Sequence, residues 1–356
     1  MSVTDDGITN ASTDIFYPAF TFYHVKDLNN VESIFKPTLY CIIAFCGLVG
    51  NSLVLWILMC IKKMNSVTDI YLLNMAVSDL LFVFSLPFAV YQIKDQWVFG
   101  NAMCKILSVI YYTGFYSGIF FITVLSVDRY LAILRVVFSL KFRTMKLGLF
   151  LSFTIWTFSV LLSIPNVLIH KEETEKGFTF CAVSYPEDQN IHWTELFSLL
   201  QVNIFGFIIP LAVILFCYSH IIRALQNSRS VQKKYAVRLI LVIVIVFFLF
   251  WTPYNVVIFL TILDTIGTFG ASNFTNWLKD AKDVTQTISF VHCCLNPVVY
   301  SIAGENFRKH LYNMFFKLLK CMRLKRHWGS IENSGIDKKS STGKDTKSLS
   351  FTDTIV

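Results

Sequence analysis

The stretch that decides the fold is Leu125-Ser126-Val127-Asp128-Arg129-Tyr130-Leu131-Ala132-Ile133, where an acid and a base stand together after a long apolar run. The 22 residues between Lys105 and Asp128 include no Asp, Glu, Lys or Arg. A helix that rises about 1.5 Å per residue crosses the hydrocarbon core of a membrane with about 20 such residues. The pair at its end has two interpretations: a charged helix end whose arginine reaches for the membrane surface, or an inward-facing functional pair.

The composition of the whole chain is that of a membrane protein. Hydrophobic residues make up 54% of the 356 residues and charged residues 15%, whereas soluble domains have about 25% charged residues. We predict an all-α membrane protein in which seven transmembrane helices form a bundle, followed by a short amphipathic helix on the cytoplasmic membrane surface. The seven spans are expected at 37–61, 68–93, 106–134, 147–169, 194–222, 236–263 and 284–303.

Four regions follow from this division. Residues 1–36 form a disordered extracellular tail, 37–303 the bundle, 304–320 the amphipathic helix and 321–356 a cytoplasmic tail rich in Ser and Thr. In the amphipathic stretch, apolar side chains fall on one face and basic ones on the other, which suits the inner leaflet. Cys321, directly after it, is an expected palmitoylation site.

Charge fixes the expected orientation. If the N-terminus is outside, the outer segments hold eight basic and fifteen acidic residues, a net charge of −7 within a chain of net charge +8. Inner loops rich in Lys and Arg are the rule in membrane proteins. We therefore expect a multi-pass plasma-membrane protein with an extracellular N-terminus.

The outer segments contain the residues that extracellular chemistry would use. Cys104 and Cys181 are the two of nine cysteines expected there, so one disulfide would fix the 4–5 loop over the bundle. The sequons at Asn10 and Asn273 also fall outside and predict glycosylation.

Polar residues inside the spans predict a functional core. Asp79 lies midway along an apolar span, and burying it alone would cost several kcal/mol. We expect it to face the bundle and to meet Asn51 and Asn296. We expect the same three residues to be able to hold a sodium ion, although Gly118 supplies no hydroxyl to it.

Prolines and aromatic residues in spans 5, 6 and 7 indicate a part of the bundle with two states. Proline weakens a helix at its position, and freed carbonyls next to large aromatic side chains allow movement. The alternative is static kinks that only shape the packing. The residues concerned are Pro210, Tyr218, Trp251, Pro253, Asn296, Pro297 and Tyr300.

Taken together and in order, these motifs resemble the rhodopsin-like, class A G-protein-coupled receptors over residues 37–320. Asp128-Arg129-Tyr130-Leu131-Ala132-Ile133, the segment 66–74 and His292-Cys293-Cys294-Leu295-Asn296-Pro297 are similar to chemokine receptors, and most of all to the CC type. The resemblance implies a chemokine as ligand, coupling to a heterotrimeric G protein of the inhibitory class, and arrestin binding to a phosphorylated tail. It implies no enzymatic activity and no cofactor.

The resemblance also assigns roles to residues. Ligand capture falls to Asp14, Tyr17, Tyr23, Glu172, Glu173 and Glu175, and the ligand's own N-terminus enters a pocket near Tyr40, Tyr111, Tyr254 and Gln286. Because chemokines are basic, the outer charge of −7 suits them independently. Coupling through the bundle is expected to run from Trp251 to Asp128, Arg129 and Tyr130, with Tyr218 and Tyr300 behind Arg129.

Two departures from the family pattern lie at the outer end. The family has a second disulfide from the N-terminal tail to the 6–7 loop, but residues 1–36 and 264–283 contain no cysteine. The glutamate that the family has in upper span 7 is Gln286 here, which forms no charge-assisted pair with a ligand amine.

Two other functions remain as alternatives. A decoy that sequesters chemokine would keep the fold, but such receptors often lose the Asp-Arg-Tyr-Leu-Ala-Ile pattern, which this chain keeps. A transporter or channel would need charged residues along several spans or an internal repeat. Away from the span ends, only Asp79 and the Asp128-Arg129 pair are charged.

Overall fold

The computed structural model describes residues 30–135, 143–175, 177–184, 191–226, 231–268, 272–303 and 312. The predicted tail residues Asn10, Asp14, Tyr17 and Tyr23 lie outside this part of the chain, as do Cys321, the tail 321–356 and, apart from Tyr312, the predicted amphipathic helix. The helices described below belong to one compact unit, which ends at Glu305.

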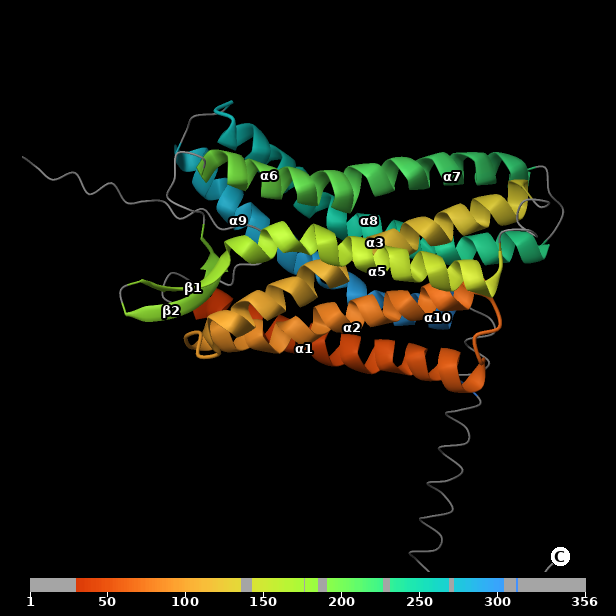
Figure 1. Ribbon diagram of the computed structural model, residues 1–356, viewed down its shortest axis with the longest axis horizontal. Helices are drawn as coiled ribbons and strands as arrows, with labels where there is room; N and C mark the ends of the chain where they lie inside the picture. Colours follow the sequence, from red (N-terminus) through yellow and green to blue (C-terminus); the bar gives the residue numbers. More distant parts are fainter. Residues whose placement is uncertain are drawn as a thin grey trace, which may run out of the picture. The chain divides into compact units, whose positions relative to one another are not determined.

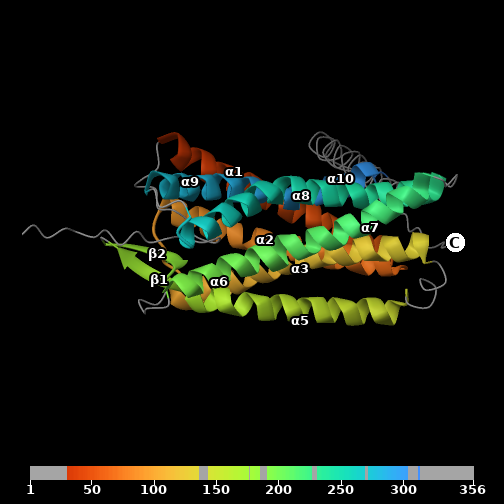
Figure 2. The same cartoon turned by 90° about the horizontal axis from the view of Figure 1, so that it is seen from above.

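Long helices lie side by side through this unit (Figures 1 and 2). They are α1 (Asn30–Trp56), α2 (Val67–Lys94), α3 (Gly100–Leu134), α5 (Met145–Ile169), α6 (Ile191–Asn203), α7 (Ile209–Gln226), α8 (Val231–Thr265), α9 (Ser272–Ser289) and α10 (His292–Ala303). π-helical turns at Ile57–Ile61 and Ile204–Ile208 extend α1 and join α6 to α7. α3 is the central helix, because it packs against α2, α5, α7 and α8.

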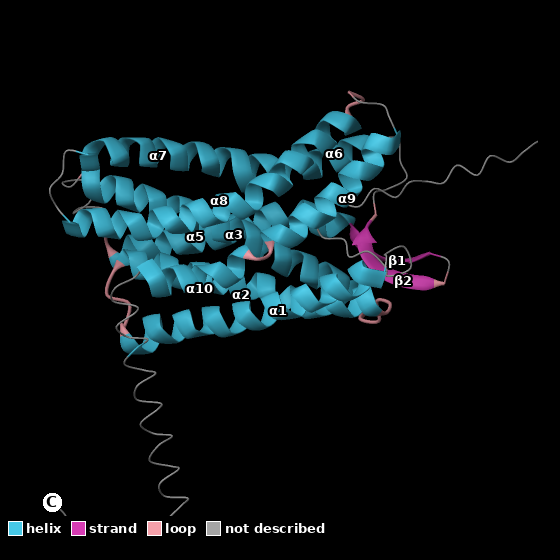
Figure 3. Cartoon of the chain, turned by 180° about the vertical axis from the view of Figure 1, so that it is seen from behind, coloured by secondary structure: helices cyan, strands magenta, loops and turns pink. Residues whose placement is uncertain are grey.

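Six helical segments in the described residues are long and apolar enough to cross a membrane. Their bounds are Ile34–Ile61, Val67–Lys94, Gly100–Leu134, Met145–Ile169, Trp193–Ala224 and Ile240–Thr265, close to the first six predicted windows. The seventh window, 284–303, straddles a break: Phe290 and Val291 form a turn between α9 and α10 (Figure 3). The predicted seven-helix membrane bundle is confirmed, with the seventh span in two pieces.

Local sequence explains several helix ends. Ser66 begins α2 with a capping box, in which its hydroxyl accepts from the Asp69 amide while the Asp69 carboxylate accepts from the Ser66 amide. Thr144 caps α5 through the Leu147 amide. The π turn before Pro210 follows from the proline itself. In a regular α-helix, Pro210 would have no N–H to donate to the Gly206 carbonyl, and its ring would clash with that carbonyl.

The close approach of α1 to α10 depends on a glycine. A Cβ at Gly50 would lie 2.8 Å from Pro297 Cγ, so α1 and α10 approach this closely only because residue 50 lacks a side chain. Gly50 and Pro297 therefore act together in the packing of the first and seventh spans.

A two-stranded hairpin covers the start of α3. β1 (His170–Glu175) pairs antiparallel with β2 (Phe178–Val183), and Gly177, with φ +85°, occupies the turn. Cys181 in β2 is bonded to Cys104 in α3 with a Cα–Cα distance of 5.6 Å, which confirms the predicted disulfide. The Gln92 side chain binds both the amide and the carbonyl of Cys181. We call this end of the bundle the disulfide end, and the opposite end, where α3 finishes, the Asp128 end.

Candidate functional site

The Asp128 end contains a compact charged cluster. The Asp128 carboxylate is buried and accepts a hydrogen bond from Arg129 Nη2 at 2.9 Å. Thr68 of α2 contributes a hydroxyl that Asp128 Oδ2 accepts at 3.3 Å and to which Arg129 also donates. The pair therefore faces inward, where it is fixed by a second helix, and is not a snorkelling helix end.

A second arginine joins the same carboxylate. Arg143 Nε donates to Asp128 Oδ1 at 2.7 Å and Arg143 Nη2 donates to Oδ2 at 3.2 Å. The sequence pattern does not predict this contact. The two residues are fifteen positions apart with 136–142 between them, and no helical or strand periodicity connects them.

Aromatic residues surround this cluster on the α7 side. The Tyr130 ring lies 5.7 Å from Phe216 and 6.0 Å from His220, so the third residue of the motif points to α7. Tyr218, also on α7, is buried beside Ser126 and Arg129. The backbone of Tyr300 belongs to α10, while its side chain lies outside the described part of the structure.

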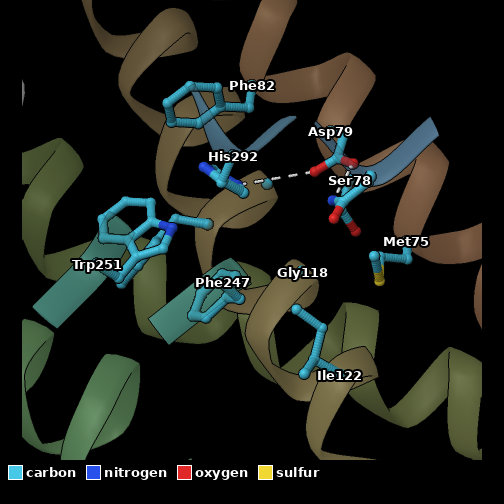
Figure 4. Close-up of a pocket in the computed structure, with 12 residues that line it drawn as sticks. Met75, Ser78, Asp79, Phe82, Gly118, Ile122, Phe247, Trp251 and His292 are labelled. Atoms are coloured by element: carbon cyan, nitrogen blue, oxygen red, sulfur yellow. Dashed lines mark hydrogen bonds and ion pairs between the residues drawn. The ribbon is translucent and has the colours of Figure 1, made fainter. Parts of the chain in front are cut away.

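Asp79 forms a second cluster in the middle of the bundle (Figure 4). Asn296 Nδ2 donates to Asp79 Oδ2 at 2.7 Å, and His292 Nε2 lies 3.8 Å from Asp79 Oδ1. Asn51 does not join this contact: its amide donates to the carbonyls of Gly47 and Cys293. Of the two expected partners, the structure therefore brings Asn296 to Asp79 and leaves Asn51 on the α1–α10 seam.

A small cavity of about 10 Å³, room for one water molecule, adjoins this carboxylate. It is lined by Met75, Ser78, Asp79, Phe82, Gly114, Phe115, Gly118, Ile122, Phe247, Trp251, His292 and Asn296.

The lining does not suit the predicted sodium ion. A hard cation needs several oxygen ligands, yet Gly118 has no side chain, Asn51 does not line the cavity, and an imidazole nitrogen is near the second carboxylate oxygen. We derive no function from sodium.

Trp251 stands between this cavity and the disulfide end. Its ring is 4.6 Å from Phe115, 5.3 Å from His292 and 5.8 Å from Tyr254, and it stacks on Phe247. Pro253 follows two residues later inside α8. In the described part of the chain the buried indole N–H of Trp251 has no hydrogen-bond partner. The ring is thus held by packing and not by a directional bond.

The predicted ligand-pocket residues lie above Trp251, on the disulfide side, and are all buried. Gln286 Nε2 donates to Tyr111 Oη at 3.4 Å, and Tyr40 Oη lies 3.2 Å from Thr287 Oγ1. Rings connect the set, since Phe290 contacts both Tyr40 and Tyr111. Tyr40, Tyr111 and Gln286 are brought together, while Tyr254 joins them through aromatic neighbours.

The predicted acidic loop residues are on the β hairpin. The Glu172 amide donates to Asn101 of α3, and Glu173 pairs with Lys171 at 2.8 Å. Glu175 ends β1 and stands opposite Phe178. Asn273 is part of α9, and the structure describes its backbone but not its side chain.

Comparison with known proteins agrees with this geometry. The family model described as 7 transmembrane receptor (rhodopsin family) matches residues 50–300. Human (Homo sapiens) C-C chemokine receptor type 4 is 44% identical over 88% of this chain and 89% of its own length. Human type 8 is 40% identical over 100% of both chains, and human type 1 is 45% identical over 79% of both.

A bundle of membrane spans with the Asp128–Arg129 ion pair at one end and a disulfide-bound hairpin at the other defines a seven-transmembrane receptor of the rhodopsin family, which is not an enzyme. Within that class, the chain belongs to the CC chemokine receptors. From the segments 95–100 and 120–123, the sequence alone predicts the greatest similarity to type 8. The identities to types 4, 8 and 1 are all 40–45%, so the comparisons do not single out one type.

Proposed function

We propose that this chain is a plasma-membrane receptor for a CC chemokine, with its disulfide end outside, and that it suppresses cyclic AMP through a G protein of the inhibitory class. The net charge of the segments at each end supports the orientation. The observation that carries the signalling role is the ion pair of the buried Asp128 with Arg129 at the end of the central helix. Placing such a pair within a membrane costs free energy, so its presence there indicates a function.

The disulfide end is the proposed ligand side. The body of a basic chemokine meets the acidic tail residues and the hairpin, with Glu172 and Glu173 partly exposed on β1. The flexible N-terminus of the chemokine then contacts the buried group of Tyr40, Tyr111, Tyr254 and Gln286. Ligand contacts that differ between two states shift their populations.

Trp251 is the proposed link between the two ends. It touches Tyr254 on the ligand side and His292 on the Asp79 side, and no directional bond to a described residue opposes a change in its rotamer. Pro253 weakens α8 beside it. Movement of α8 at the Asp128 end then opens the site for the G protein.

Arg129 is the proposed contact to the G protein. In the resting state it is paired with Asp128 and bonded to Thr68. On activation it leaves Asp128, and Arg143 stays as the partner of that carboxylate, so no buried charge is left alone. Tyr218 and Tyr300 fill the space behind it. The phosphorylated tail then recruits arrestin. Further proposed modifications are glycans on Asn10 and Asn273 and an acyl chain on Cys321.

The test is to express the chain in cells and to screen a panel of recombinant chemokines for suppression of cyclic AMP. We expect Arg129→Ala to abolish the response to the active chemokine and to leave its binding within about threefold. Arg135→Ala, an exposed arginine at the end of the same helix, is the matched control and should keep most of the response.

Two outcomes would contradict the proposal. Chemokine binding by the wild-type chain without a cyclic AMP response would favour a sequestering decoy. Equal loss of binding and response in Arg129→Ala would remove the role given to Arg129.

A further inference from the structure

An ion pair joins α1 to α9 at the disulfide end. Lys36 Nζ contacts Asp283 Oδ1, and the two side chains are only 8% and 20% exposed. The same ammonium group lies 5.9 Å from the centroid of the Tyr40 ring, within reach of a cation–π interaction. Because the pair is largely removed from water, losing one partner would leave a poorly solvated charge.

A second contact lies one helical turn deeper on both helices. Tyr40 Oη is 3.2 Å from Thr287 Oγ1, and that hydroxyl in turn donates to the Asp283 carbonyl at 2.9 Å. Residues 36 and 40 are four apart on α1, and 283 and 287 are four apart on α9. Side chains at this spacing share one helix face, so the two contacts lie one above the other and form a short seam between α1 and α9.

This seam lies where the chain has no covalent cross-link. Residues 1–36 and 264–283 contain no cysteine, so no disulfide can join the N-terminal segment to the start of α9. The Cys104–Cys181 bond fixes the hairpin to α3 and leaves α1 and α9 unconnected. Only non-covalent contacts can therefore hold α1 and α9 together at this seam.

We propose that Lys36 and Asp283, supported by Tyr40 and Thr287, form a non-covalent clasp that sets the spacing of α1 and α9 and thereby positions the ligand pocket. Tyr40 belongs to the clasp and to the pocket, and Gln286 is adjacent to Thr287 on α9. The clasp rests on the proposed function, because it positions that same pocket. Lys36 and Asp283 act as positioning residues, without the chemokine having to touch them.

The first test needs no ligand. Hydrogen–deuterium exchange and thermal unfolding are measured on the purified full-length chain, comparing the wild type with Lys36→Gln and Asp283→Asn. We expect amide exchange in 36–43 and 283–290 to rise by about tenfold, and the apparent Tm to fall by about 3–6 °C. Exchange at the Asp128 end should not change.

Three further variants make this result specific. Lys36→Arg keeps the charge and should behave as the wild type, and the charge-reversed double variant Lys36→Asp with Asp283→Lys should recover most of the protection. Lys94→Gln removes an exposed lysine of α2 at the disulfide end and should change neither the exchange nor the apparent Tm. Wild-type exchange in Lys36→Gln, or a double variant no better protected than Lys36→Gln and Asp283→Asn, would overturn the clasp.

The second test uses the recombinant chemokine that gives the strongest wild-type response in the panel. We expect Lys36→Gln to weaken its binding by about fivefold and the charge-reversed double variant to restore it. If no chemokine binds the wild type, the proposed function fails, while the exchange experiment still decides whether the clasp exists. Unchanged binding despite increased exchange would overturn the positioning role.

Discussion

Two aspartates in this bundle, Asp79 and Asp128, are equally buried and yet have opposite kinds of partner. Asp79 meets a neutral amide from Asn296 and an imidazole from His292, and a cavity adjoins it. Asp128 is bonded by two arginines and lies at a helix end. The comparison suggests a division of roles, in which Asp79 organises the packing of α2 with α10 and Asp128 holds a contact that can exchange partners.

The partners also differ in how they can be released. Arg129 and Arg143 are long side chains, 13% and 31% exposed, so each can reach water while the other remains on Asp128. Asn296 is buried, and separating it from Asp79 would leave two buried polar groups without the hydrogen bond that they share. The Asp128 cluster is therefore the better switch, and the Asp79 cluster the better framework.

The largest expected effect comes from removing the framework carboxylate. Asp79→Ala should destabilise the resting bundle by about 1–3 kcal/mol, because Asn296 is left buried without its acceptor. Asp79→Asn is the matched control, since its amide oxygen can still accept the Asn296 bond. Thermal unfolding of the two variants measures the difference, and equal loss of stability would mean that the hydrogen bond is not what Asp79 contributes.

A smaller effect is expected from the shared hydroxyl in the other cluster. Thr68→Val keeps the side-chain shape but removes a hydroxyl that accepts from Arg129 and Arg143 and donates to Asp128, at a cost of about 1 kcal/mol. We expect basal suppression of cyclic AMP to rise by about two- to fivefold while chemokine binding is kept. Thr123→Val, which removes a hydroxyl bonded within α3 alone, should leave basal activity unchanged. If both valine variants behave alike, the Thr68 contact does not restrain Arg129.

The sequence predicts most of the fold because charge-free runs have a direct meaning in a membrane. Apolar length placed the first six spans within a few residues of their observed ends, since a charged residue such as Lys62 or Asp95 marks where each run can stop. Neither π turn was predicted. The turn before Pro210 has a proline as its local cause, whereas the turn at Ile57–Ile61 has no such residue to mark it. The break at Phe290 and Val291 likewise has no Gly or Pro to mark it.

The site was predictable where residue type alone sets the requirement. A carboxylate such as Asp79 must find a polar partner at that depth, and Asn296 is one. Which other polar side chain meets it was not predictable: His292 lies beside Asp79, whereas the expected Asn51 donates to backbone carbonyls. The contacts of Arg143 and Lys36 depend on how loops and helix ends fold back, over separations of 15 and 247 residues, and no local pattern encodes that.

The most direct test of the central claim is basal G-protein activation in membranes without ligand, measured as nucleotide exchange at equal surface expression. Asp128→Asn weakens the hold on Arg129 and should raise basal exchange several-fold above the wild type. Asp79→Asn, which leaves that pair intact, should not raise it. No increase in Asp128→Asn, or an equal increase in both variants, would contradict the account that Asp128 restrains the coupling arginine.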